Sequence, residues 1–197
     1  MPTLTFKKMW KHLRTVQTHR KWVRHYCFLS GIPWQGITHD LSKYSPAEFF
    51  ESARYWSGTF SPIDAAKEDK GISLAWLHHR GRNKHHYLYW YDNIEEGGYC
   101  HVMPKKYFIE LVCDFLGAAR TYLKKDFSFQ KEKEWWEKKR EKVKLNDKHI
   151  IMLDIIFSDL AYCERRAYID VLTPEKLLKT GYIGMIWEAN CGNTDLY

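Results

Sequence analysis

The feature that most constrains how this chain can fold is a cluster of histidines around one His-Asp pair. Eight of the ten histidines lie between residues 12 and 86, and His39 is followed directly by Asp40. Four of the eight fall in the short segment 78–86. Histidine binds metals as the neutral imidazole and titrates near neutral pH. We therefore expect the fold to bring side chains that are distant in sequence to one polar, metal-binding site.

Apolar residues recur at helical spacing through most of the chain. In the first segment, residues 5–29, they are Phe6, Met9, Leu13, Val16, Val23 and Cys27. Steps of three and four residues predict an amphipathic helix. On this helix His12 and His19 border the apolar stripe and can point inward, whereas His25 faces water. From helix position alone, a buried histidine with an ordinary hydrogen-bond partner is the commoner case.

The remaining helices are predicted from the same spacing and from start and stop residues. We expect them at 46–56, at 73–90 with a kink at Gly81, at 104–123, at 128–143, at 147–163 and in a short segment from Thr173. Residues 57–71 are predicted to be a loop with one helical turn at most, and residues 91–104 another loop. The charges of 128–143 are expected to form a solvated helix face. Because 147–163 is apolar nearly all round, it is expected to be a central helix or a contact in a homo-oligomer.

No segment alternates apolar and polar residues, so the prediction is a mainly α-helical protein. We expect a single-domain helical bundle over residues 1–197. Its metal-site core covers about residues 5–120, and helices of about 128–190 pack on that core.

Composition narrows the class of protein. The net charge is +7, but lysine and arginine are interleaved with acids, which disfavours a nucleic-acid surface. A cationic rim would still attract phosphate-bearing substrates. The five cysteines are odd in number and form no Cys-x-x-Cys pair, which favours a reducing compartment. With neither a leader-like apolar segment nor a run of eighteen apolar residues, a cytoplasmic protein with no membrane contact is expected.

A hydrolytic metal site needs imidazoles and carboxylates from several elements, with a position left for water. His19, the pair His39-Asp40, the later histidines and Asp114 supply such a set. Asp114 borders the apolar face of its helix, where a carboxylate without a partner is costly. The alternatives for Asp114 are a surface acid or a buried hydrogen bond. Asp154 and Asp159 are reserve carboxylates.

The segment His39-Asp40-Leu41-Ser42-Lys43 resembles the HD-domain superfamily of metal-dependent phosphohydrolases, in which His and His-Asp motifs lie on a helical bundle. The chain is more closely similar to an uncharacterised bacterial and phage family. That likeness covers about residues 5–120 and rests on three motifs. They are His19 with Val23, His39 to Lys43, and the set Ala75, Trp76, Leu77, His79, Asn83, His85 and His86.

This resemblance implies an HD-like fold with one or two divalent transition-metal ions, such as Mn, Fe, Co, Ni or Zn. It implies that His19, His39, Asp40 and Asp114 bind a first ion, and that His79 with either His85 or His86 binds a second. The implied reaction is attack of a metal-activated water on a small phosphorylated or nucleotide substrate. We assign phosphate binding to Lys43 and Arg82, with a helix-cap or ion-pair role and plain surface charge as their alternatives. Asn83 would orient a ligand or the substrate, and His78 would support the ligands.

Two other functions fit the same residues. The resemblance also reaches di-iron oxygenases built on the HD scaffold, which iron content and oxygen uptake would reveal. A non-enzymatic binding module with a structural zinc is the second alternative, and a closed site with four ligands would support it.

Overall fold

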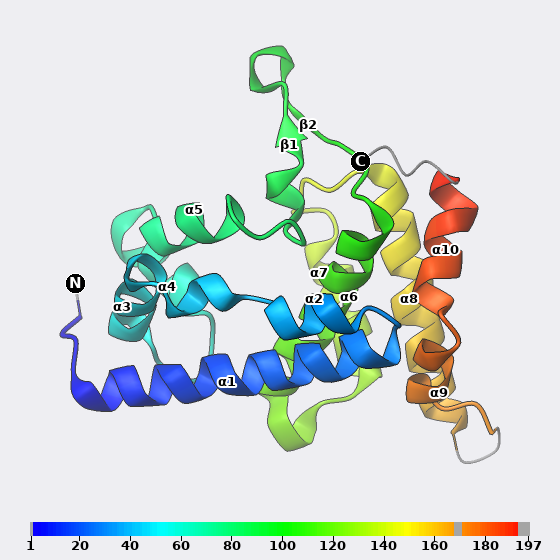
Figure 1. Cartoon of the computed structure of the whole chain (residues 1–197), viewed down its shortest axis with the longest axis horizontal. Coiled ribbons are helices and arrows are strands. Elements are labelled where there is room, and N and C mark those ends of the chain that lie inside the picture. Colours follow the sequence, from blue (N-terminus) through cyan, green and yellow to red (C-terminus); the bar gives the residue numbers. More distant parts are fainter. Residues whose placement is uncertain (1, 168–170, 193–197) are drawn as a thin grey trace.

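The computed structural model describes residues 2–167 and 171–192. Within these residues the chain forms ten α-helices, which confirms the prediction of a mainly helical fold (Figure 1). The helices are α1 (Phe6–Leu29), α2 (Pro33–Thr38), α3 (Pro46–Tyr55), α4 (Pro62–Lys70), α5 (Leu74–Arg80), α6 (Lys105–Leu123), α7 (Phe129–Lys139), α8 (Asp147–Arg166), α9 (Pro174–Lys179) and α10 (Tyr182–Cys191). A two-residue pair of antiparallel strands, β1 (Tyr91–Asp92) and β2 (Tyr99–Cys100), forms a projecting hairpin.

Most of the helices form two groups, one at each end of the molecule, and α1 and α6 connect these groups. Figure 1 shows α3, α4 and α5 at one end and α8, α9 and α10 at the other, with α1 running along one side. The apolar core lies under α6, α7, α8 and α10, with Phe108, Leu116, Trp136, Phe157 and Trp187 among its members. None of the helices in the described residues has both the length and the hydrophobicity needed to cross a bilayer.

The close approach of α1 to α6 depends on a glycine. A β-carbon built at Gly117 would lie 2.4 Å from Cγ2 and 3.0 Å from the backbone nitrogen of Val23. Only a residue without a side chain therefore fits at this crossing. Val23 is four residues after His19, and Gly117 is three residues after Asp114. The contact thus fixes the separation of two predicted metal ligands.

The segments around the histidines differ from the sequence predictions. The expected helix 73–90 ends at Arg80, because Gly81 to Asn83 turn back on the last carbonyls of α5. His85 and His86 therefore lie in a loop. The expected loop 57–71 contains α4, which begins at Pro62 and ends at Lys70. Gly71, the next residue, adopts the left-handed conformation. Proline at the first position of a helix and glycine just after its last residue are common boundary signals, and the prediction gave them too little weight.

The segment before His39 contains the short helix α2, which the sequence analysis did not predict. It packs against α1 at Gly36, where an added β-carbon would lie 2.7 Å from Cβ of Cys27. The helix expected to be apolar nearly all round, α8, buries Met152, Leu153, Ile156, Phe157 and Leu160, and it exposes Ile151 and Tyr162. One face of α8 thus packs on the core, and a homo-oligomer contact on its other face stays a prediction.

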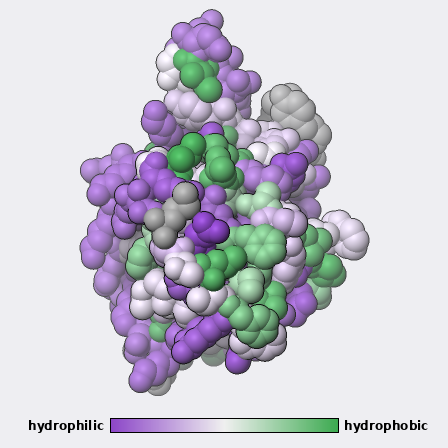
Figure 2. All heavy atoms as spheres, turned by 90° about the vertical axis from the view of Figure 1, so that its left-hand side faces the viewer, coloured by the Kyte–Doolittle hydropathy of each residue, from purple (hydrophilic) through white to green (hydrophobic). Residues whose placement is uncertain are grey.

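Figure 2 faces the end of the molecule formed by α3, α4 and α5 and shows apolar side chains at the surface among polar ones. Exposed apolar residues of this region include Phe50 on α3, Phe60 before α4 and Leu74 on α5. Such scattered apolar residues are normal on a protein surface.

Gly117→Ala should destabilise the protein by about 2 kcal/mol, because the added methyl group overpacks the contact with Val23. At this chain length the loss corresponds to a melting temperature lower by about 4–8 °C, measured by calorimetry or circular dichroism. Gly184→Ala in α10 is the matched control, since its β-carbon would meet no atom closer than 3.8 Å. That variant should be as stable as the wild type or more so. Equal melting temperatures for the two variants would contradict the packing argument.

Candidate metal centre

His39 and Asp40 point into the same site because the backbone turns between them. His39 follows the last residue of α2, and Asp40 adopts a left-handed conformation with φ of 55°. Aspartate is one of the few residues other than glycine that tolerate this conformation. In a regular helix, adjacent side chains would diverge. Here His39 Nε2 lies 3.2 Å from Asp40 Oδ2.

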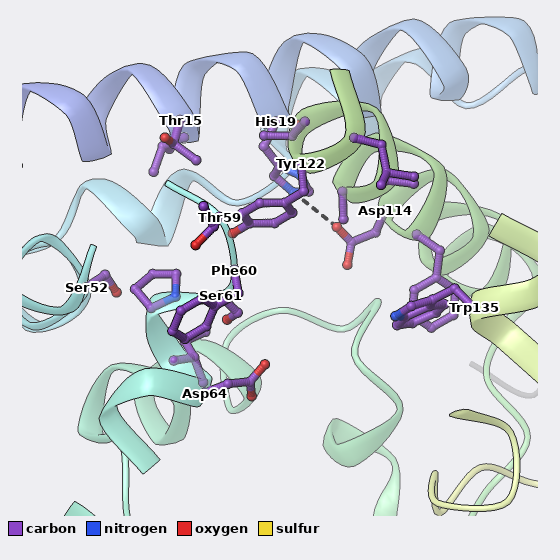
Figure 3. Close-up of a pocket in the computed structure, with 18 of the residues that line it drawn as sticks. Thr15, His19, Ser52, Thr59, Phe60, Ser61, Asp64, Asp114, Tyr122 and Trp135 are labelled. Carbon is purple, nitrogen blue, oxygen red and sulfur yellow. Dashed lines mark ion pairs between the residues drawn. The ribbon is translucent and has the colours of Figure 1, made fainter. Parts of the chain in front are cut away.

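Four side chains from three parts of the chain form the first donor set. His19 Nε2 on α1 lies 3.2 Å from His39 Nε2, 3.3 Å from Asp40 Oδ2 and 3.1 Å from Asp114 Oδ1 on α6. Figure 3 shows His19 and Asp114 facing each other from α1 and α6. For a tetrahedral ion with bonds of about 2.1 Å, donor atoms are about 3.4 Å apart. The spacing of this set therefore suits a transition-metal ion.

A second donor set surrounds the other carboxylate oxygen of Asp40, Oδ1. Asp40 Oδ1 is 3.2 Å from His79 Nε2 on α5 and 3.5 Å from His85 Nε2. His86 completes this set, with one donor atom of each residue within 4.8 Å of the others. The sequence predicted either His85 or His86, but both are present, because two adjacent residues of a loop can turn inward together.

Unsatisfied polar atoms mark the second donor set. Asp40 Oδ1 and the Nε2 atoms of His85 and His86 are buried and have no hydrogen-bond partner among the described residues, whereas Asp40 Oδ2 contacts Lys43. Buried polar atoms without partners are rare in proteins, and an unoccupied ion position is one of their ordinary causes. The residues present could therefore hold a metal ion, and Asp40 belongs to both donor sets.

Two glutamates that the sequence analysis missed orient the histidines. Glu110 Oε1 on α6 accepts hydrogen bonds from Nδ1 of His39 at 2.9 Å and from Nδ1 of His85 at 3.1 Å. Glu48 on α3 accepts from Nδ1 of His79 at 2.7 Å and from Nδ1 of His78 at 2.6 Å. A carboxylate that accepts from Nδ1 leaves Nε2 unprotonated, and this is the tautomer that binds a metal through Nε2.

The pKa values of Glu110 and His86 agree with the hydrogen bonds. Burial alone would lower the pKa of His39 and of His79, but the charge of Asp40 outweighs burial and raises both. Burial alone would raise the pKa of Glu110, but the hydrogen bonds from His39 and His85 outweigh burial and lower it. Burial and repulsion from His85 and His79 keep the pKa of His86 well below its usual value. Glu110 is thus an anion and His86 a neutral imidazole, which are the forms that the donor sets need.

Negative charge exceeds positive charge at this site. Asp40, Asp114, Glu48 and Glu110 place four carboxylates around the histidines, and Lys43 Nζ, 2.6 Å from Asp40 Oδ2, compensates one of them. Uncompensated buried charge is strongly unfavourable. One or two divalent cations would supply the missing positive charge.

The other predicted site residues are placed as follows. Asn83 donates to the Ser42 hydroxyl at 2.8 Å and to the backbone oxygen of His79 at 2.8 Å, so it ties the loop to α5 and to the segment after Asp40. Arg82 is exposed and is not among the residues that line the cavity described below. The reserve carboxylates are elsewhere, since Asp154 contacts Trp136 and Arg140, and Asp159 contacts Tyr182.

The two missed glutamates had weak sequence signals. Glu110 precedes Asp114 by four residues and therefore shares its helix face, which spacing alone could have shown. Glu48 follows Ser45 by three residues, which is the spacing of a helix-capping motif and gives no sign of a role in a site. In the structure Ser45 makes no side-chain capping bond, and Glu48 points to the histidines.

A cavity of about 740 Å³ opens onto the donor sets. His19, Lys43, His79 and Asp114 line its inner end. Figure 3 shows Thr59, Phe60, Ser61 and Asp64 on one side of it, with Tyr122 and Trp135 on the side of α6 and α7. This volume is within the usual range of small-molecule sites. The donor sets are thus accessible to a ligand.

Asp40→Asn should remove most of the bound metal, because it discharges the carboxylate shared by both donor sets while keeping a side chain that tolerates the left-handed backbone. The measurement is metal content per chain by mass spectrometry, with circular dichroism to verify the helical fold. His25→Ala, on the exposed face of α1, is the control and should retain the wild-type content. An unchanged stoichiometry in Asp40→Asn would refute the centre.

Glu110→Gln should weaken metal binding by about 10–100-fold, since a neutral amide cannot hold both Nδ1–H groups and removes one charge. Competition with a chromogenic chelator measures the dissociation constant. Glu141→Gln, at an exposed position, should bind as the wild type does. If both variants bind equally, Glu110 has no role in orienting the ligands.

Comparison with known proteins gives a family but no function. No curated protein and no solved structure matches the chain at a significant level. The model of a family of unknown function, DUF5662, matches residues 8–158, which include both donor sets, both glutamates and most of the cavity. Because the match covers about three quarters of the chain's length, the chain belongs to the DUF5662 family.

Proposed function

We propose that this protein is a metal-dependent phosphohydrolase with an HD-like site, acting on a small phosphorylated substrate. The observation that carries the proposal is the position of Asp40, whose two oxygens face different sets of imidazoles beside an open cavity. Two ions held by one carboxylate are a common arrangement for phosphoester hydrolysis.

Each part of the site has a role in this reaction. The residues of the two donor sets would hold a divalent ion, which would supply the acidity needed to make water a nucleophile near neutral pH. Glu48 and Glu110 hold the imidazole rings in the tautomer that leaves Nε2 free. Lys43, at the inner end of the cavity, is placed to bind a phosphate oxygen and to stabilise the charge that develops there.

The surroundings of the site also suit an anionic substrate. Lys131, Lys138 and Lys139 on α7 line the cavity, and such charges raise the local concentration of anions. Phe115 and Ala118 contribute apolar wall beside Asp114, which limits access of water to the reacting group. Arg82, which the sequence suggested as a phosphate ligand, has no place in this proposal because it lies outside the cavity.

The geometry favours this function over a structural zinc. A structural zinc site is closed by four protein ligands. Here seven side chains form two overlapping sets, and His19, His79 and Asp114 line a cavity. The di-iron oxygenase uses a similar donor set and is separated from the hydrolase by experiment.

Lys43→Met should lower kcat/KM for a phosphomonoester by about 100–1000-fold without loss of metal, because it removes a charge from the phosphate site. Metal content is measured first, and the protein loaded with the metal found is assayed for phosphate release from a panel of phosphomonoesters. Lys7→Met, on the exposed start of α1, is the matched control and should have wild-type activity. Retained metal with no phosphate release from any ester, together with oxygen uptake by the iron form, would replace the hydrolase with the oxygenase.

A further inference from the structure

Glu132 occupies a position where an apolar residue is expected. The buried face of α7 is formed by Phe129, Glu132 and Trp136, three residues at helical spacing. The sequence analysis placed the charges of this segment on a solvated face, and for Glu132 that prediction is wrong. Its exposed fraction is 3%, whereas Glu134 on the same helix is exposed. A carboxyl group at such a position is costly unless something binds it.

Glu132 lines the cavity, and its carboxyl group has no partner within residues 2–167 and 171–192. Among the described residues, no hydrogen bond or ion pair to its carboxyl group is found. The cavity that it lines extends from Asp114 and the metal centre to α7. Burial, with a smaller contribution from Asp114, raises the pKa of Glu132 to about 8. The carboxyl group is therefore available to a ligand in the cavity.

Aromatic side chains form part of the wall of the same cavity. Phe115, Tyr122 and Trp135 line the cavity on α6 and α7, and the ring centroids of Phe115 and Trp135 are 5.5 Å apart. Figure 3 shows Trp135 on one side of Asp114 and Tyr122 on the other. Flat rings of this kind bind another planar ring through its face.

We infer that Glu132 is a specificity-determining residue, which accepts a hydrogen bond from a ring N–H of the substrate while the aromatic wall packs against the ring. The inference takes the proposed hydrolysis as given and names the organic part of the phosphoester, a planar ring with an N–H donor at its edge.

The chemistry of a carboxyl group explains the choice of a donor. One of its oxygens accepts a hydrogen bond whether the group is ionised or protonated, whereas it donates only when protonated. A substrate that lacked the donor would leave the buried carboxyl group unpaired, and sites of this kind discriminate strongly against such analogues. A cationic ammonium group fits less well, since Lys131, Lys138 and Lys139 line the same end of the cavity.

The test uses nucleosides that carry no phosphate, so it does not depend on hydrolysis. The probes are two matched pairs, inosine with 1-methylinosine and uridine with 3-methyluridine, in which a methyl group replaces the ring N–H. Isothermal titration calorimetry of the metal-loaded protein should show that at least one N–H nucleoside binds tenfold or more tightly than its methylated partner. If neither pair shows this difference in the wild type, the inference fails.

Three variants of α7 assign the effect to Glu132. Glu132→Met should bind both members of the pair equally, at the level of the methylated probe. Glu132→Gln keeps an oxygen that accepts a hydrogen bond, so it should retain most of the preference for the N–H nucleoside. A contact that depended on charge alone would be lost in this variant. Glu137→Met, at an exposed position, should behave as the wild type does. A preference that survives in Glu132→Met would overturn the inference.

Stability separates recognition from a structural role. Because no group of the described protein binds the carboxyl, Glu132→Met should melt at the wild-type temperature or higher. A melting temperature lower by several degrees would show that Glu132 holds the fold and would also overturn the inference. The proposed function is tested apart from this, since phosphate release from any ester depends on the metal centre. Loss of discrimination with hydrolysis retained rejects the inference alone, and discrimination without hydrolysis rejects the function alone.

Discussion

The structure depends on a buried excess of negative charge at the meeting point of its helices. Asp40 after α2, Glu48 on α3, and Glu110 and Asp114 on α6 come from three parts of the chain, and Lys43 contacts one of these carboxylates. Such a group of carboxylates is unstable in an apolar interior unless cations or protons compensate it. The helices α1, α3 and α6 supply the apolar surroundings in which a metal ion would be the natural counter-charge.

The candidate metal centre has an inner set of possible ligands and an outer set of groups that orient them. Glu110 holds one histidine from each donor set, and Glu48 holds His79 together with His78 on α5. Loss of Glu110 should therefore disturb histidines on two segments of the chain, whereas loss of Glu48 should disturb α5 alone. Such outer groups commonly matter almost as much as the ligands themselves.

The cavity joins two kinds of chemistry in one space. Its inner end is polar and charged at His19, Lys43 and Asp114, where a phosphate group would be bound. Its lining on α6 and α7 includes the rings of Phe115 and Trp135, lysine side chains and the buried Glu132. A cavity of this kind can bind one end of a ligand by charge and the other end by shape and hydrogen bonding. The helix α7 thus contributes to the cavity wall as well as to the core.

The sequence by itself determined the helical fold and predicted the residues that meet in the two donor sets. Helical spacing put His19 and Asp114 on the borders of apolar faces, and the resemblance of His39 to Lys43 to a known motif selected them as partners. The sequence did not determine the roles of Glu48, Glu110 and Glu132, or the joint placement of His85 and His86. Acids at apolar helix positions look alike in a sequence, because what decides their role is a partner from another element. Only the tertiary structure, by closing α6 on α1 and ending α5 at Arg80, showed which carboxylates meet an imidazole and which faces an open cavity.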